Sequence, residues 1–206
     1  GDGLSIETVI LRTQSGRTAL CVSSQVGCGA NCSFCATGKS GIRPNLEPAE
    51  ILDYLVQANL HLAKEGRRVR NIVFMGMGEP FHNESNVHAA LAVLQNKECF
   101  QHSAAQISVS TVGIPDAMQR FATAAPGVHL ALSLHSANQA SREQIIPLAS
   151  RYHLDSLHQA VEAVGRLQGQ AVMIEYLMLA GVNDGPDDLD ALDRWVQGLN
   201  VHINLI

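Results

Sequence analysis

The stretch VGCGANCSFCATG, residues 26–38, places Cys28, Cys32 and Cys35 at the spacing C-x3-C-x2-C within one loop. The chain has five cysteines, and the remaining two are isolated. A structural zinc site takes four ligands, commonly as two close pairs, and no second pair is present. A redox-active C-x-x-C motif at Cys32 and Cys35 would leave Cys28 without a role. Three clustered thiolates therefore favour a 4Fe-4S cluster that leaves one iron open to another ligand.

Around this loop, short β-branched runs alternate with amphipathic runs of helical length. This pattern is expected of βα units around a parallel sheet. The predicted core strands are residues 19–25, 71–76, 106–111, 128–135, 171–179 and 200–206. The predicted helices are residues 47–65, 85–96, 114–123, 154–167 and 187–197. We therefore predict an α/β fold, a partial (β/α)6 barrel with too few strands to close as an eight-stranded barrel.

The amino-terminal part of the chain predicts a β-hairpin. The runs SIETVILR (5–12) and RTALCVSS (17–24) flank QSG, a turn sequence. No Pro-, Gly- or Ser-rich linker interrupts the 206 residues, so we expect one domain over 1–206, with residues 1–18 as a hairpin extension. The chain starts with Gly and ends inside an apolar run, so we expect it to be a piece of a longer protein.

The composition excludes several classes of protein. Hydrophobic residues make up 46% of the chain, which is typical of a globular domain. Neither an apolar run of about 18 residues nor a basic-then-apolar leader is present, so we predict no membrane span, no secretory signal and a cytoplasmic location. The net charge of −5 indicates no broadly basic surface for a polyanion. Arg67, Arg68 and Arg70 form one basic cluster, which a solvated helix end explains.

The sequence CVSSQVGCGANCSFCATG (21–38) resembles the RlmN and Cfr family of adenosine RNA methyltransferases, which are radical S-adenosylmethionine (SAM) enzymes. The further matches cover nearly the whole chain and are IETV, NIVFMGMGEP, ISVSTVGIP, LALSLHSAN, RYHL, EYLMLAGVND and HINLI. The resemblance implies the radical SAM type of partial barrel as a core domain, without the family's amino- and carboxy-terminal flanking parts. It also implies that Cys28, Cys32 and Cys35 hold a 4Fe-4S cluster and that SAM chelates the open iron. An electron donor such as flavodoxin or ferredoxin is implied as a partner.

The resemblance assigns further residues to SAM. MGMGEP (75–80) leaves a predicted strand with two glycines, which let a ligand approach the backbone closely. Gly78 and Glu79 are thereby implied to bind the methionine end of SAM. Without the resemblance, this motif is a tight turn with a solvated glutamate.

Other implied SAM contacts fall near the ends of predicted strands, where parallel barrels and sheets place their sites. These contacts are Ser110, Ser133, Leu134, His135 and Asn204. Taken singly, a hydroxyl at a strand end commonly satisfies a backbone group. We expect His135 to bind SAM rather than to transfer protons.

Two residues are implied to act on the RNA base. Cys21 lies in the predicted strand 19–25 on the same face as Ser23 and Gln25, where a buried free cysteine is ordinarily a small hydrophobic residue. The resemblance implies that Cys21 deprotonates the alkylated base carbon and then forms a disulfide that releases the product. Glu7 is implied to be a further proton acceptor, and would otherwise be solvated.

The implied reaction is methylation of an adenosine, at C2, in large-subunit rRNA, with tRNA as a further candidate and with two SAM molecules consumed. The family's second reactive cysteine has no counterpart in the 206 residues, and Cys99 is expected to be structural. Pro44 stands where the family commonly has arginine. Two alternatives remain open: a radical SAM enzyme with a non-RNA substrate, which the acidic charge suits, and a module that binds SAM and the cluster without catalysis.

Overall fold

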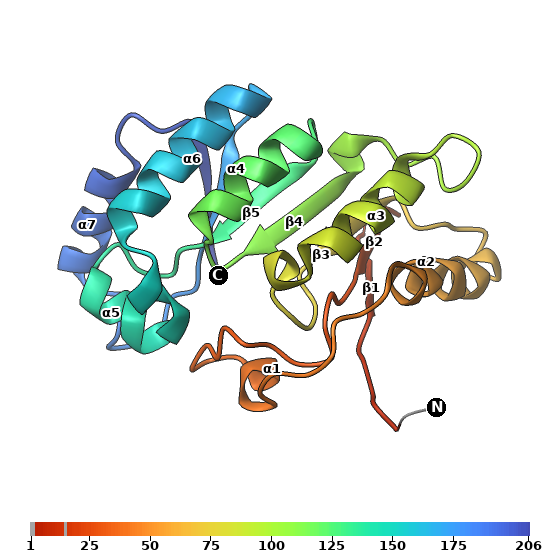
Figure 1. The fold of residues 1–206 in the computed structure, drawn as a ribbon, viewed down its shortest axis with the longest axis horizontal. Coiled ribbons are helices and arrows are strands. Elements are labelled where there is room, and N and C mark those ends of the chain that lie inside the picture. Colours follow the sequence, from red (N-terminus) through yellow and green to blue (C-terminus); the bar gives the residue numbers. More distant parts are fainter. Residues whose placement is uncertain (1–2, 15) are drawn as a thin grey trace.

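The computed structural model describes residues 3–14 and 16–206. Within these residues one sheet has seven strands, and neighbours in the sheet are also neighbours in the chain (Figure 1). The strands are β1 (Val9–Arg12), β2 (Thr18–Cys21), β3 (Asn71–Phe74), β4 (Ile107–Thr111), β5 (His129–Ser133), β6 (Val172–Tyr176) and β7 (Val201–Leu205). β1 pairs with β2 in antiparallel orientation, and the pairs from β2 to β7 are parallel. The predicted α/β class and the partial barrel are confirmed.

Helices connect the parallel strands. They are α1 (Ala36–Lys39), α2 (Pro48–Ala63), α3 (Glu84–Gln95), α4 (Pro115–Ala124), α5 (Gln139–Ile145), α6 (Leu154–Gln168) and α7 (Pro186–Val196). Short 3-10 turns lie at η1 (Pro80–Asn83), η2 (Ala104–Gln106) and η3 (Pro147–Arg151). α2, α4 and α7 each begin with proline, whose fixed φ angle suits a first helical turn. No helix in the described part of the chain is both long and apolar enough to cross a membrane.

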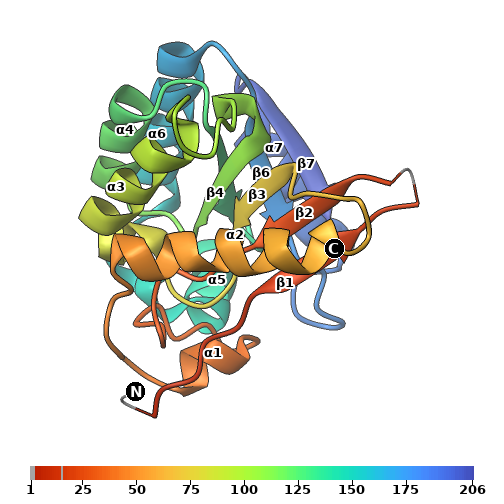
Figure 2. The same cartoon turned by 90° about the vertical axis from the view of Figure 1, so that its right-hand side faces the viewer.

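The core lies between the sheet and its helices. α3, α4 and α6 lie together on one face of the sheet (Figures 1 and 2). Alternate strand residues point to this face, as Ile107 and Val109 of β4 and Ile174 of β6 do, and their side chains are fully buried. The residues between them point to the opposite face, which is the inside of the partial barrel. Polar side chains on that inner face are therefore free to form a site.

The predicted elements agree closely with the observed ones. The five predicted helices are found as α2, α3, α4, α6 and α7, with ends within two residues. The strand predicted over 128–135 stops at Ser133, because His135 adopts a φ angle of 55°, which no strand accommodates. α5 and η3 were not predicted. Ser15 of the predicted QSG turn lies outside the described residues.

Candidate active site

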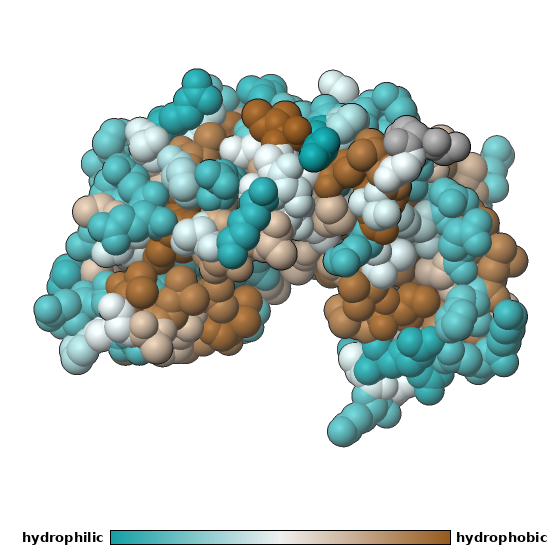
Figure 3. All heavy atoms as spheres, turned by 90° about the horizontal axis from the view of Figure 1, so that it is seen from below, coloured by the Kyte–Doolittle hydropathy of each residue, from teal (hydrophilic) through white to brown (hydrophobic). Residues whose placement is uncertain are grey.

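A cavity of about 260 Å³ lies at the carboxyl ends of the parallel strands. The predicted site residues that line it are Cys28, Cys32, Cys35, Gly78, Glu79, Ser110, Ser133 and His135. Figure 3 shows the molecule from below, which is the end toward which the β4 arrow points in Figure 1. From this side the surface is hollowed between two lobes. The structure thus brings the three loop cysteines to the same cavity as residues from several strand ends.

Strand register explains why these polar residues converge. Ser133 pairs with Glu175 and Glu175 pairs with Asn204, and paired residues of neighbouring strands project on the same face. The same register, followed back through β4 and β3, places Ser110 and Cys21 on this inner face. Cys21 and Asn204 share the face but do not line the cavity, and Asn204 is exposed on the outermost strand.

The cysteine loop is anchored on the segment around α5. Cys28 and Cys32 are buried and pack with Ile145, Ile146 and Ala149. The Ser33 backbone N–H donates to the carbonyl oxygen of Ile145 at 2.9 Å. Long-range packing, and not the loop sequence alone, therefore fixes where the cysteines lie.

The two buried loop thiols, Cys28 and Cys32, resist ionisation. Burial, followed by the charges of Cys28 and Cys35, raises the pKa of Cys32 to about 12. Burial also raises the pKa of Cys28. Metal ligation deprotonates such thiols, so the donor set suits a metal group and not three free thiolates.

The arrangement fits a multi-iron group better than a single ion. In the part of the chain that the structure describes, no three His, Cys, Asp or Glu side chains are placed to hold one metal ion. In a 4Fe-4S cluster each thiolate binds a different iron, so the sulfurs need not converge on one point. Within the described residues the cysteines form no disulfide, which leaves Cys28, Cys32 and Cys35 free as ligands.

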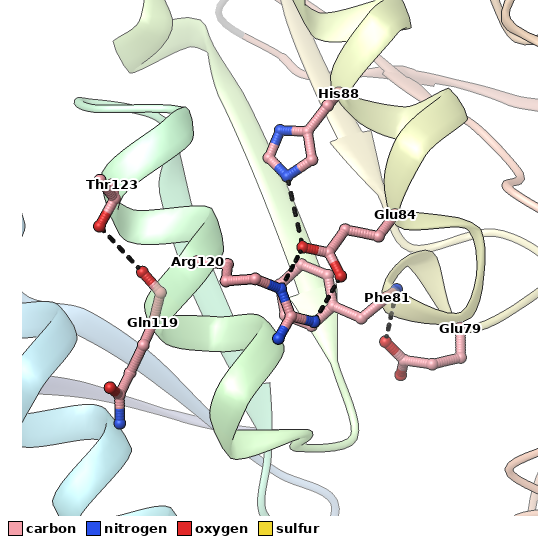
Figure 4. A network of polar contacts seen from close by, with 7 residues as sticks. All are labelled: Glu79, Phe81, Glu84, His88, Gln119, Arg120 and Thr123. Carbon is pink, nitrogen blue, oxygen red and sulfur yellow. Dashed lines mark hydrogen bonds and ion pairs between the residues drawn. The ribbon is translucent and has the colours of Figure 1, made fainter.

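Glu79 is buried and not solvated, so the simple exposed-turn interpretation is wrong. The residue is 2% exposed. Its Oε1 accepts from the Phe81 N–H at 3.0 Å and from Thr111 Oγ1 at 2.9 Å, and its Oε2 accepts from the Val112 N–H at 2.8 Å (Figure 4 shows the contact with Phe81). Burial raises the pKa of Glu79. The carboxyl group therefore joins the turn after β3 to the end of β4.

Gly78 is required by both its conformation and its surroundings. Its φ angle is 102°, in the region that favours glycine. A Cβ atom at this position would lie 2.7 Å from the backbone nitrogen of Gln25. The close approach of the two segments forms one wall of the cavity.

Glu175 was missed by the sequence analysis, although it lines the cavity. Its Oε2 accepts from Ser110 Oγ at 3.2 Å and from Ser133 Oγ at 3.4 Å. The available signal was its place in β6, where it alternates with the buried residues Ile174 and Tyr176. A carboxylate beside two hydroxyls can accept hydrogen bonds from hydroxyl or ammonium groups of a ligand.

His135 lines the cavity as a neutral ring. Its Nδ1 accepts from the Leu177 N–H at 3.0 Å, and its ring meets Phe34 edge-on with centroids 5.0 Å apart. Burial, with the charge of Arg142, lowers its pKa to about 4. The preceding Leu134 has its side chain fully buried in the core and does not line the cavity.

The buried neutral His135 predicts a loss of stability in acid. Because its pKa is depressed in the folded state, its contribution is present above the unfolded value of about 6.5 and is lost as the pH falls toward about 4. This corresponds to a loss on the order of 3 kcal/mol in the free energy of unfolding. Urea unfolding between pH 4 and 7 should show a steeper decline for the unsubstituted chain than for His135→Asn, a residue that tolerates positive φ. Parallel declines would contradict the prediction.

Glu7 and Cys21 lie apart from the cavity lining. Glu7 is exposed, and its backbone carbonyl accepts from Ser23 Oγ at 2.7 Å. Cys21 is half-buried at the end of β2, and burial raises the pKa of its thiol. The observed strand ends at Cys21, so the predicted continuation to Gln25 is wrong, although Ser23 and Gln25 are buried.

A larger cavity of about 770 Å³ lies at the opposite end of the sheet, where β2, β3 and β4 begin. Arg67, Arg68 and Arg70 line it and are exposed, as the interpretation of a solvated helix end predicts. Cys99 also lines it and is exposed. This cavity holds none of the clustered cysteines, so the smaller one is the candidate active site.

Known proteins provide an independent comparison. The family described as "Radical SAM superfamily" matches residues 22–195. "Probable RNA methyltransferase RB6963" of Rhodopirellula baltica is 54% identical over 99% of the chain, which spans 54% of that protein. "Probable dual-specificity RNA methyltransferase RlmN" of Thermosynechococcus vestitus is 44% identical over 100% of the chain, which spans 59% of that protein.

A solved structure gives the same result for the fold. The crystal structure of a radical SAM methyltransferase from Sphaerobacter thermophilus superposes with a TM-score of 0.96, at 39% identity, over 99% of this chain and 60% of that one. The chain thus spans little more than half the length of the relatives that it matches. The chain belongs to the radical SAM superfamily, whose cofactors are a 4Fe-4S cluster and SAM, and its sequence is RlmN-like.

Proposed function

We propose that this chain is the radical SAM core of an RNA methyltransferase that methylates an adenosine, at C2, in large-subunit rRNA. tRNA is a further candidate substrate, and two SAM molecules are used. The observation that carries the proposal is the meeting of Cys28, Cys32 and Cys35 with polar strand-end residues at one cavity. The names of the similar proteins, which are RNA methyltransferases, support RNA as the substrate class.

Each residue has a proposed role. Cys28, Cys32 and Cys35 hold the cluster, which with SAM supplies the radical chemistry when both are bound. The residues proposed to bind SAM are Gly78, Glu79, Ser110, Ser133, Leu134, His135 and Asn204. To these we add Glu175, because its carboxylate lies between the hydroxyls of two of them. Glu79, Ser110 and His135, which are buried and line the cavity, also exclude water from the reacting atoms.

Cys21 and Glu7 are proposed to accept protons from the modified base. Cys21 projects from β2 on the inner face, so its Sγ is directed to the side from which a flipped-out base would enter. A flavodoxin or ferredoxin is proposed as the electron donor, and the cytoplasm as the location.

The proposal is tested on the full-length protein that carries this chain. The protein is reconstituted without oxygen and incubated with SAM, reductant and a transcript of large-subunit rRNA. Nucleoside mass spectrometry should then detect 2-methyladenosine, and 5′-deoxyadenosine should form. Formation of 5′-deoxyadenosine without methylated RNA, for either rRNA or tRNA, would overturn the RNA assignment. A protein that retains zinc and ignores SAM would overturn the proposal as a whole.

A further inference from the structure

Arg142 of α5 is a charged side chain with no exposed surface. Its guanidinium group donates to the carbonyl oxygens of Val112 and Ser133 through Nη2, and to that of Leu134 through Nε. These carbonyls follow or end β4 and β5, next to the candidate active site. Arg142 therefore joins the ends of two neighbouring strands.

The third guanidinium nitrogen, Nη1, has no hydrogen-bond partner among the described residues, although it is buried. No carboxylate within that part of the chain forms a salt bridge with Arg142. Arginine cannot release its proton at physiological pH, and an unpaired buried charge is costly. Burial lowers the pKa of Arg142 only to about 10, so the group stays charged. A negatively charged acceptor is therefore missing from its surroundings.

The cysteine loop lies on the same segment. α5 ends at Ile145, whose carbonyl oxygen accepts from the N–H of Ser33, the residue after Cys32. Ile145 also packs in one cluster with Cys28 and Cys32. Val112, whose carbonyl oxygen accepts from Nη2 of Arg142, packs against the same cluster and lines the cavity. The guanidinium group is thus held next to the residues that pack around the loop cysteines.

We infer that Arg142 is a positioning residue for the proposed cluster, with its buried charge facing the Cys32 side of the ligand set and its free Nη1–H donating to a sulfur there. The inference rests on the cysteine ligands of the proposed function. A cation and a hydrogen-bond donor beside the sulfurs stabilise the more negative, reduced state. Arg142 thereby raises the reduction potential and eases acceptance of the electron.

The competing explanation is structural, because Arg142 also holds β4 and β5 together. Two substitutions separate the explanations. Arg142→Lys keeps the charge, whereas Arg142→Gln keeps much of the volume and removes the charge. Arg120→Gln is the matched control, because Arg120 pairs with Glu84 on the outer face (Figure 4), and the Arg120 side chain is exposed.

The experiment measures the midpoint potential of the reconstituted full-length protein by EPR-monitored redox titration, together with iron content and melting of the apo-protein. Arg142→Gln should shift the ratio of oxidised to reduced cluster at least tenfold toward the oxidised form, which is about 59 mV for one electron. Arg142→Lys should restore most of this shift, and Arg120→Gln should cause none.

Each other outcome is also decisive. A folded Arg142→Gln apo-protein that loads no cluster, with Arg142→Lys loading normally, supports the inference. A fully loaded Arg142→Gln variant with an unchanged potential overturns it. Unfolding of both Arg142 variants as apo-proteins assigns the residue to the sheet alone and also overturns it. Failure of the unsubstituted protein to bind a cluster would instead refute the proposed function.

Discussion

Cys32→Ala is expected to reduce the iron content of the reconstituted protein to background and to abolish 5′-deoxyadenosine formation. Cys32 is 7% exposed and lines the cavity. In the sequence it stands between the other two loop cysteines. Its loss leaves two thiolates, too few to hold a cluster that already has one open iron. Iron analysis, absorbance spectroscopy and chromatography of the SAM products measure the effect.

Two cysteine variants serve as controls for this result. Cys99→Ala should load iron and cleave SAM normally, because Cys99 is exposed at the opposite end of the sheet. Cys21→Ala should also keep the cluster, since Cys21 does not line the cavity, but should fail to release methylated RNA. Full iron content and undiminished SAM cleavage in Cys32→Ala would contradict the ligand assignment.

Glu79→Ala is expected to lower the free energy of unfolding of the apo-protein by about 3–5 kcal/mol. The substitution leaves the buried donors of Phe81, Thr111 and Val112 without their acceptor, and each such loss costs about 1–3 kcal/mol. The substitution also opens a cavity between the turn that follows β3 and the end of β4. Urea unfolding followed by circular dichroism measures the change.

The size of this effect is checked with two further variants. Glu79→Gln keeps one carbonyl oxygen but sets an amide donor against a donor, so about half of the loss is expected. Glu98→Ala removes an exposed carboxylate and should change the free energy of unfolding by less than about 0.5 kcal/mol. A loss below about 1 kcal/mol in Glu79→Ala would show that the hydrogen bonds of Glu79 contribute little.

The fold was predictable because the core strands and long helices have regular apolar patterns. In β4 and β6, buried apolar residues such as Val109 and Ile174 occur at every second position. In α6 the buried residues lie on one face of the helix over about four turns. α5 was missed because its seven residues are too few for a periodic signal. Its start is set locally by Asn138, whose Oδ1 accepts from the Ser141 N–H at 3.2 Å.

The site was predictable only in part. Parallel sheets place their sites at the carboxyl ends of the strands, which predicts Ser110 and Ser133 at the site. Both residues line the cavity. Glu175 and Arg142 were missed because a charged residue is expected on the surface, and only long-range packing shows that a strand neighbour or a helix brings it inside. Leu134 was named with its neighbours, yet its side chain faces the core, because polarity alternates along the strand end.

The anchoring of the cysteine loop on α5 affects how the chain matures. The Ser33 hydroxyl bonds to the Ile145 carbonyl across 112 residues of sequence. At synthesis rates of about 5–20 residues per second, the thiols leave the ribosome roughly 5–20 s before the segment that shields them. Parallel pairing of distant segments is also slow to form. During that interval the nascent thiols are open to oxidants and to stray metals, because the residues around α5 that pack on them have not yet been made.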